Sequence, residues 1–418
     1  MRHMLLIMMI IQICAMLFTS WHGFVAFFGL RKARPLPGPG TPQNRFAVVI
    51  CANNEENVIG SLLDALSRQT YPMEMFHVFL LADHCTDATA EIGRRYPFVT
   101  VYEKNVGDQN GKGAVLSWGI KKILRKYTED FDAFLFFDAD NVPAEDFMMK
   151  INAHLALGNE IIQGKRLAGR PYKTFVTDWY AIYWPLYNYI YSYSREKLGF
   201  SSFLTGTGFA VRTDLLKEYG WRTSSITEDV EWSFKMCMRG HRISFCETAV
   251  FYDEQPSTVR AMFPQLIRWC TGSYQILRTY LGEWVRSFKD PSIKRTHTQV
   301  CLFDNLELLL MGPVQIVSTF AGAVAQLIMI DKVPKSIPFI ILGFLGTYIG
   351  TLAAAYFITR FCGITIREIR AGFFTFPIFL AIYTLCSLIA LLRPQTKWVK
   401  VVHEGITERK KDDLSLPA

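Results

Sequence analysis

The stretch Phe46-Ala-Val-Val-Ile-Cys-Ala52 places seven apolar residues in a row, and the polar run Asn53–Glu56 follows it directly. A short continuous apolar run of this kind is typical of a strand that is buried on both faces of a parallel sheet. The pattern returns at Phe76–Ala82, before Asp83, and at Ala133–Phe137, before Asp138-Ala139-Asp140. These stretches decide the fold, because each predicts a buried strand with polar residues at its carboxyl end.

Helical stretches separate these strands along the chain. We expect helices from about Glu56, over Asp87–Tyr96 and over Lys112–Tyr127, with a further strand at Val99–Glu103. Alternating strands and helices favour an α/β fold with a parallel, Rossmann-like sheet. Ligands bind such sheets beyond the carboxyl ends of the strands, so the polar clusters mark the expected site. Neither a Gly-x-Gly-x-x-Gly fingerprint after the first strand nor a Walker lysine loop is present.

Asp138 and Asp140 lie two residues apart at a predicted strand end. The period of two places both side chains on one face, where two carboxylates repel each other unless a cation lies between them. A divalent metal that holds a diphosphate is the natural cation. A lone Asp-x-Asp is common by chance, so the pair gains weight only from its context.

Thr227-Glu228-Asp229 opens a predicted helix at Asp229–Arg239. One interpretation is structural, with the threonine as a cap and the acids interacting with the helix dipole. The other is catalytic, with a carboxylate fixed as general base beside an acceptor hydroxyl.

Gln265, Arg268 and Trp269 share one face of a predicted helix, since they are spaced i, i+3 and i+4. The first two suit phosphate oxygens, and an indole ring offers a flat surface to a sugar. An arginine–tryptophan anchor at a membrane interface would produce the same pattern.

A segment at Asp178–Arg195 is crowded with aromatic residues, which suit either an interfacial belt or the lining of a saccharide or lipid path. They are Trp179, Tyr180, Tyr183, Trp184, Tyr187, Tyr189, Tyr191 and Tyr193.

Composition bounds the class of protein. Of 418 residues, 50% are hydrophobic and 20% charged, so membrane segments and a soluble part are both expected. The net charge of +8 is spread along the chain without a polybasic block, and we predict no nucleic-acid partner. The nine cysteines include no Cys-x-x-Cys pair, which argues against a disulfide framework or a structural zinc site.

Four segments free of Asp, Glu, Lys and Arg are long enough to span a bilayer: Met4–Leu30, Leu308–Ile330, Ile337–Thr359 and Ala371–Leu392. The first is too long for the apolar region of a signal peptide, and no small-residue cleavage site follows it, so we expect an anchor.

Basic residues predict the orientation. Arg31–Arg34 and the arginine-rich loop Arg360–Arg370 both place the central region in the cytoplasm. The basic tail from Lys397 also reads as cytoplasmic, although four spans would put it on the other side. One segment is therefore a candidate for re-entry, with Gly312-Pro313 as a possible break.

The order of these motifs, followed by membrane segments, resembles the membrane-integrated branch of family-2 glycosyltransferases. That branch includes cellulose, hyaluronan and poly-N-acetylglucosamine synthases and ceramide glucosyltransferase. The matching pieces are Cys51–Glu56, Ala82–Asp87, Gly111-Lys112-Gly113, Asp138–Asp140, Thr205–Gly208, Thr227–Asp229, Asp253–Pro256 and Gln265–Trp269. The proline and tyrosine usual in the first motif are absent, as are a gating-loop motif and a cyclic-dinucleotide receptor domain, which puts cellulose synthesis in doubt.

The resemblance implies a GT-A fold and a set of site residues. The residues expected to contact the nucleotide sugar are Asn53, Glu55, Asp83, Lys112 and Asp138, with Asp83 on the uracil. The metal, Mg²⁺ or Mn²⁺, falls to Asp140 and Asp138. Asp229 is the expected general base, with Glu228 beside it. The diphosphate and the acceptor fall to Gln265, Arg268 and Trp269.

The expected layout is an anchor and linker (1–40), a cytoplasmic catalytic domain (41–295), three membrane segments (296–393) and a basic tail (394–418). The resemblance implies an inverting transferase in the plasma membrane that uses a nucleotide sugar, with UDP as the expected nucleotide. A processive polysaccharide synthase leads, a non-processive glycolipid transferase is the alternative, and a non-enzymatic transporter or scaffold is the remote third. Partners are the donor, a saccharide or lipid acceptor and membrane lipid. The sequence leaves an accessory subunit undecided.

Overall fold

A computed structural model gives the fold, and it describes residues 2–30, 40–107, 111–127, 130–289, 297–328 and 333–395. Expectations that rest on Arg31–Arg34 or on the tail from Lys397 lie outside the described residues.

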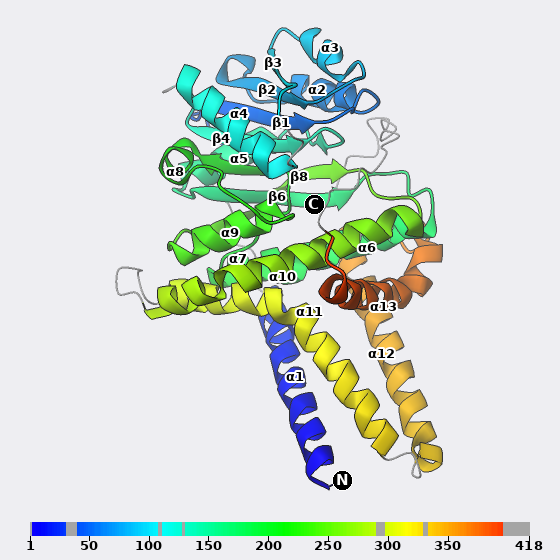
Figure 1. The fold of residues 1–418 in the computed structure, drawn as a ribbon. Coiled ribbons are helices and arrows are strands. Elements are labelled where there is room, and N and C mark those ends of the chain that lie inside the picture. Colours follow the sequence, from blue (N-terminus) through cyan, green and yellow to red (C-terminus); the bar gives the residue numbers. More distant parts are fainter. Residues whose placement is uncertain are drawn as a thin grey trace.

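The globular part is built on one eight-stranded sheet in the order β3-β2-β1-β4-β7-β6-β8-β5 (Figure 1). The strands are β1 (Phe46–Ala52), β2 (Phe76–Asp83), β3 (Val99–Lys104), β4 (Ala133–Asp138), β5 (Val142–Pro143), β6 (Ile161–Ala168), β7 (Phe209–Arg212) and β8 (Ile243–Asp253). The pairs β3–β2, β2–β1 and β1–β4 are parallel, which confirms the expected Rossmann-like half.

The helices of this half cover both faces of the sheet. They are α2 (Ile59–Ser67), α3 (Thr89–Arg94), α4 (Lys112–Lys126) and α5 (Phe147–Ala156), with a short turn η1 (Met73–Met75). The four strand predictions hold to within one residue. The first helix begins three residues later than expected, because Glu55 and Glu56 belong to the loop that follows β1.

The second half of the sheet was not predicted from sequence. β7 pairs antiparallel with β4 and β6, and β8 runs parallel to β6 and antiparallel to β5. The mixed sheet places the carboxyl ends of β6 and β8 beside the end of β4. Two short helices belong here: α8 (Thr213–Tyr219) and α9 (Glu228–Met238).

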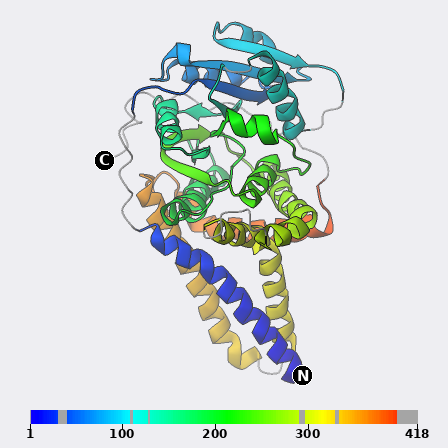
Figure 2. The same cartoon turned by 90° about the vertical axis from the view of Figure 1, so that its left-hand side faces the viewer.

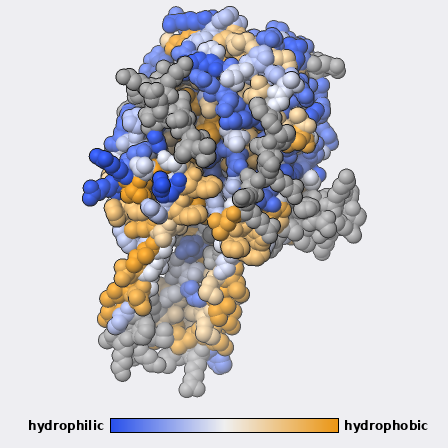
Figure 3. Space-filling view, turned by 180° about the vertical axis from the view of Figure 1, so that it is seen from behind, coloured by the Kyte–Doolittle hydropathy of each residue, from blue (hydrophilic) through white to orange (hydrophobic). Residues whose placement is uncertain are grey.

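Long helices underlie the sheet. The aromatic segment forms α6 (Phe175–Tyr187), a π-helical stretch η2 (Asn188–Tyr193) and α7 (Ser194–Leu198), and α10 (Val259–Lys289) crosses beneath the site. Four more helices are apolar: α1 (Arg2–Phe28), α11 (His297–Ile328), α12 (Val333–Phe361) and α13 (Arg370–Leu392). Figure 3 shows hydrophobic side chains on the lower helices and hydrophilic ones over the sheet-bearing part.

Three helices of the described chain are long and apolar enough to cross a membrane: His3–Phe28 of α1, Ile341–Phe361 of α12 and α13. In α11 only Gly312–Ala325 is comparably apolar. The way these helices are arranged in space differs from what their length and hydropathy suggest. α1, α11 and α12 extend together away from the sheet, whereas α13 lies crosswise at the base of the globular part, against α6 and α10 (Figures 1 and 2).

Side-chain contacts hold α13 in that position. Its buried face includes Phe376 and Phe379, Asp178 of α6 accepts a hydrogen bond from the backbone N–H of Gly372 (2.9 Å), and Trp179 donates one to Thr375 (3.0 Å). The sequence predicts four segments long enough to span, one of them a candidate for re-entry, and in the structure α1, α11 and α12 run together while α13 lies crosswise to them (Figures 1 and 2). The helix that does not run with the other three is α13, and Gly312-Pro313, the possible break, lies inside a continuous α11.

Candidate active site

The loops after β1 and β2 are braced against each other. The Asn53 side chain donates to the carbonyl oxygen of Asp83 (2.6 Å), and the Glu55 N–H donates to the Thr89 hydroxyl (2.7 Å). Asn54 adopts a left-handed backbone (φ 56°), and its side-chain oxygen accepts from the Thr86 N–H (2.7 Å). These bonds fix the two predicted polar clusters as one rigid wall.

Asp83 is buried at the end of β2. Its carboxylate accepts from the Lys104 ammonium (3.1 Å) and lies 2.9 Å from the Nδ1 atom of His84. Because β3 lies next to β2, Lys104 comes to Asp83 through strand pairing, which the sequence analysis did not foresee.

The period-two argument for Asp138 and Asp140 is wrong, since β4 ends at Asp138 and Asp140 lies in the turn that follows. The Asp138 N–H instead donates to the Thr207 hydroxyl (2.8 Å), and the Asp138 carboxylate forms an ion pair with Lys112. Lys112 also donates to the Gly206 carbonyl oxygen (2.7 Å).

Negative charge nevertheless gathers at this corner. The pKa of Asp140 is raised well above its usual value by burial and then by the neighbouring carboxylates of Asp253 and Asp138, while Arg166 opposes the shift. Within the described ranges, no three Asp, Glu, His or Cys side chains are grouped closely enough to hold a metal by themselves. Two carboxylates still fit Mg²⁺, which commonly takes one or two carboxylates and completes its shell with substrate phosphates and water.

Glu228 and Asp229 form the first turn of α9. Thr227 makes no capping hydrogen bond, and its hydroxyl has no partner among the described residues, so the expected cap is absent. The two acids do lie in the first turn, where a helix dipole favours negative charge. Burial raises the pKa of Asp229, although the Val230 N–H, Lys112 and Arg268 lower it. Burial and the Asp229 charge together raise the pKa of Glu228 to about 7.

These groups face the corner formed by Lys112, Asp138 and Gly206, which we call the donor corner. A side chain at Gly206 would come within 3.3 Å of an Asp229 carboxylate oxygen, and Gly206 itself has a left-handed backbone (φ 86°). The charges of Asp138 and Glu228 raise the pKa of Lys112 against the lowering effect of its burial. Lys112 thus lies between the end of β4 and the start of α9.

The Gln265–Trp269 face of α10 lies beside this corner. Gln265 accepts from the Tyr180 hydroxyl (2.5 Å), and the half-buried Trp269 ring stacks on Tyr183 (centroids 6.0 Å apart, 19° between planes). Trp184 meets the same indole ring edge-on (5.8 Å). The charge of Arg268 acts on both Glu228 and Asp229, so the helix contributes to the same site.

Two further residues join these parts and were missed as site residues. Arg166 of β6 is buried, and its guanidinium lies over the Trp184 ring, 4.0 Å from the ring centroid. Its Nε donates to Asp253 (3.0 Å), and its Nη1 donates to the Thr205 carbonyl oxygen (2.7 Å). Asp253 belonged to a recognised motif but was given no role. No local pattern distinguishes Arg166, because its importance arises from the pairing of β6 with β8.

Comparison with known proteins agrees with this geometry. The family model described as "Glycosyltransferase like family 2" matches residues 42–272, more than half of the chain, and the model described as "Cellulose synthase" matches residues 203–370. The mannosyltransferase PcManGT from Pyrobaculum calidifontis, solved in complex with GDP-Man and Mn²⁺, has a similar structure with a TM-score of 0.60. It is 18% identical in sequence and covers 92% of this chain and 99% of that one, which supports a GT-A-like fold.

Three curated relatives are similar in sequence. The probable glycosyltransferase YdaM of Bacillus subtilis is 25% identical over 58% of this chain and 58% of its own. A beta-monoglucosyldiacylglycerol synthase of Nostoc sp. is 24% identical over 87% of this chain and 77% of its own. A poly-beta-1,6-N-acetyl-D-glucosamine synthase of Staphylococcus epidermidis is 27% identical over 55% and 54%. The chain thus spans little more than half the length of most of these relatives.

Proposed function

This chain belongs to glycosyltransferase-like family 2, and we propose that it transfers a sugar from a nucleotide sugar, with UDP as the nucleotide, to a saccharide acceptor at a membrane surface. The observation that carries the proposal is the meeting of Lys112, Asp138 and Asp229 at one corner, where Lys112 bonds both Asp138 and Gly206 and Asp229 lies against Gly206. The Lys112 ammonium, which could bind a diphosphate, and the Asp229 carboxylate, which could accept the proton of a hydroxyl, thus lie on two sides of Gly206.

The donor is proposed to lie along the braced wall. Asp83 offers a carboxylate to the uracil, Asn53 and Glu55 hold the loop beneath it, and Lys112 reaches the diphosphate. Arg268 supplies a second cation from the α10 side. Positive charge fixed beside a leaving group stabilises the negative charge that develops on it during transfer.

Asp229 is proposed as the general base. Its carboxylate accepts the proton of the acceptor hydroxyl while that oxygen forms a bond to the anomeric carbon. The bond from the anomeric carbon to the diphosphate breaks with its electron pair remaining on the diphosphate. Attack from the opposite face inverts the anomeric configuration, and no covalent enzyme intermediate is needed.

A divalent cation fits this corner, and Asp140 with Asp138 would hold it. When bound, Mg²⁺ or Mn²⁺ would neutralise charge on the diphosphate. The crowding of carboxylates that raises the pKa of Asp140 supports this assignment. Activity is then expected to vanish in chelator and return on adding the metal, whereas full activity of metal-free protein would refute the assignment.

The acceptor is proposed to be a growing polysaccharide. The Trp269–Tyr183 stack beside Trp184 offers flat apolar rings that suit a sugar ring. Trp269 is the neighbour of Arg268, whose charge acts on Asp229. A second candidate, a glycolipid-forming transferase, is favoured by α13. Its Tyr383 and Phe379 pack on Tyr183, so a helix proposed to lie at the bilayer surface adjoins that stack.

The catalytic part is proposed to lie in the cytoplasm of a cell whose plasma membrane holds α1, α11 and α12. The pairing of Gln12 with Ser318 (3.0 Å) supports α1 and α11 as neighbours in that bundle. With α13 at the interface, both of its ends would lie on the catalytic side, in agreement with a cytoplasmic basic tail.

Product sizing with radiolabelled UDP-sugars tests the proposal. Purified wild-type protein is expected to give long products, and Trp269→Ala shorter ones with unchanged UDP affinity. Trp269→Phe, which keeps an apolar ring, should fall between them. A single sugar on lipid would select the glycolipid candidate, and no turnover of any nucleotide sugar would reject both.

A further inference from the structure

A hollow lies outside the proposed active site, along the solvent side of α4. It measures about 710 Å³, within the range of small-molecule sites. Its lining comes from α4 and from the loop after α8, and consists of Gly113, Ala114, Ser117, Trp118, Lys121, Lys122, Arg125, Trp221, Arg222 and Thr223. The side chains that pack α4 on the sheet, such as Leu116 and Ile120, point the other way.

The charge of this lining has one sign. Lys121, Lys122, Arg125 and Arg222 contribute four cations, and no acidic side chain is among the described residues that line the hollow. Lys121 and Arg125 are four residues apart on α4, where like charges destabilise a helix. The repulsion would be relieved by a bound anion.

Two buried hydrogen-bond donors are unpartnered at the same place. The Trp221 side chain is 1% exposed, and its Nε1–H has no acceptor in the described part of the chain. The Thr223 hydroxyl, also buried, is likewise without a partner there. The adjacent Trp232 provides a contrast, because it stacks on Trp221 and donates its N–H to the Gly220 carbonyl oxygen (3.0 Å).

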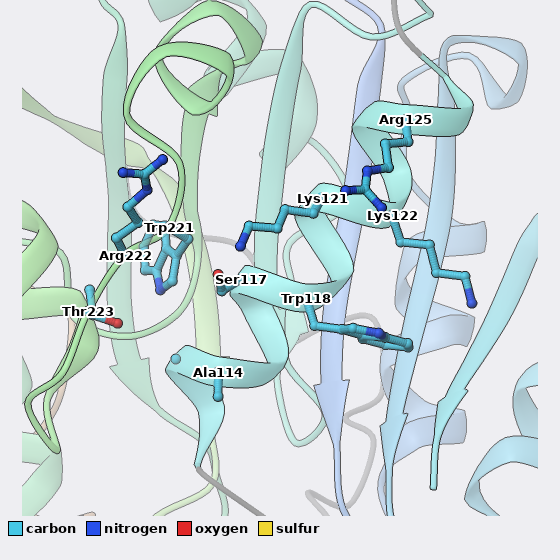
Figure 4. Close-up of a pocket in the computed structure, with 10 residues that line it drawn as sticks. Ala114, Ser117, Trp118, Lys121, Lys122, Arg125, Trp221, Arg222 and Thr223 are labelled. Atoms are coloured by element: carbon cyan, nitrogen blue, oxygen red, sulfur yellow. The ribbon is translucent and has the colours of Figure 1, made fainter. Parts of the chain in front are cut away.

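Buried polar groups are almost always hydrogen-bonded, so two unpartnered donors beside one hollow are groups that a bound anion would satisfy. Figure 4 shows the Trp221 ring nitrogen, Thr223 and Ser117 around one side of the hollow, with the Lys121 amine directed toward Trp221. Lys122 and Trp118 extend to the other side of α4 (Figure 4). The Trp221 side of the hollow therefore brings these polar groups together with the Lys121 amine (Figure 4).

We propose that this hollow binds a small phosphorylated anion, with Lys121, Arg125 and Arg222 facing the phosphate charge and Trp221, Thr223 and Ser117 donating hydrogen bonds. The site is separate from the donor corner. Gly113 stands between the two, because a side chain there would meet the Thr223 hydroxyl at 2.7 Å and the Glu228 Cβ atom at 3.0 Å.

The test is calorimetric titration with inorganic pyrophosphate, with the donor site filled by saturating UDP. Wild type is expected to bind it. The double variant K121A/R125A should bind at least about tenfold more weakly, because charge-assisted hydrogen bonds are the strong ones. The matched control K217A/R239A removes two exposed cations elsewhere and should bind like wild type.

Thr223→Val guards against misfolding as the explanation. It keeps the side-chain shape and removes a hydroxyl that has no partner in the described structure, so the protein should fold as well as wild type and bind pyrophosphate several-fold more weakly. Equal affinity of wild type and K121A/R125A, or no binding by wild type, would overturn the proposal. Capture of a polyglutamate peptide without pyrophosphate binding would also overturn it, since the surface would then suit an acidic protein.

Discussion

Asp229 and Glu228 show how neighbouring carboxyls acquire different properties. Both are influenced by Lys112 and Arg268, but only Asp229 lies against Gly206, toward the donor corner. The difference arises from the start of α9, where the two side chains leave the helix in different directions.

Asp229→Asn is expected to reduce transfer by about 10²–10⁴ while UDP affinity changes little, because the amide cannot accept a proton. Initial rates with a UDP-sugar and calorimetry with UDP provide the two readouts. Near-normal turnover by a folded variant would remove Asp229 from the role of base.

Glu228 makes stability depend on pH. Its pKa in the folded protein is about 7, above the usual 4.5. The folded state therefore keeps this proton while the unfolded chain loses it, so the stabilising contribution is complete below pH 4.5 and is lost as the pH rises to about 7. The stability of Glu228→Gln should decline less than that of wild type between pH 4.5 and about 7, as measured by thermal unfolding of metal-free protein. Parallel curves of stability against pH for the two proteins would contradict the raised pKa of Glu228.

At the scale of elements, α10 packs closely on the start of α9, where the proposed base Asp229 lies. A side chain at Gly272 of α10 would lie 1.9 Å from the Thr227 hydroxyl and 2.5 Å from its methyl group. Only a glycine allows this approach, so the two helices meet where Glu228 and Asp229 begin α9.

Gly272→Ala is expected to lower the transfer rate at least tenfold and to cost about 1–3 kcal/mol of stability, the usual range for overpacking. Gly282→Ala is the matched control, because that position in the same helix has open space around it. Restored activity in G272A/T227A would confirm the steric cause, and normal activity of Gly272→Ala would dismiss it.

The whole molecule is a sheet-bearing catalytic part on a base of crosswise helices, from which three helices descend (Figures 1 and 2). The base is tied together by α13, whose Ser387 contacts the Tyr274 hydroxyl of α10 (2.5 Å). Just beyond α13, the Gln395 N–H donates to Thr271 (3.2 Å), which keeps the chain beside α10.

Cysteine labelling of intact cells by an impermeant reagent tests the orientation that follows. In a background without native cysteines, His3→Cys at the far end of α1 should be labelled, whereas Lys104→Cys and Arg393→Cys should react only after lysis. Labelling of Arg393→Cys in intact cells would make α13 a span, and labelling of Lys104→Cys would invert the catalytic part.

The sequence by itself determined the parallel half of the sheet and where several candidate site residues lie at its edge. Strands such as Phe46–Ala52 are encoded by continuous apolar runs, and their carboxyl ends must meet at one edge of a parallel sheet. Asp83, Asp138 and the Lys112 helix were therefore predictable from local pattern and chain order. The Gln265–Trp269 face followed in the same way from the period of a helix.

Only the tertiary structure decided the rest. Arg166 and Asp253 are 87 positions apart, and strand pairing alone brings them together. The hydropathy of α13 depends on its composition and not on its orientation relative to the other helices. The sequence therefore could not distinguish a membrane span from a helix held crosswise by Asp178 and Trp179. Local patterns record what a segment buries, while the partner against which it is buried depends on contacts between distant parts of the chain.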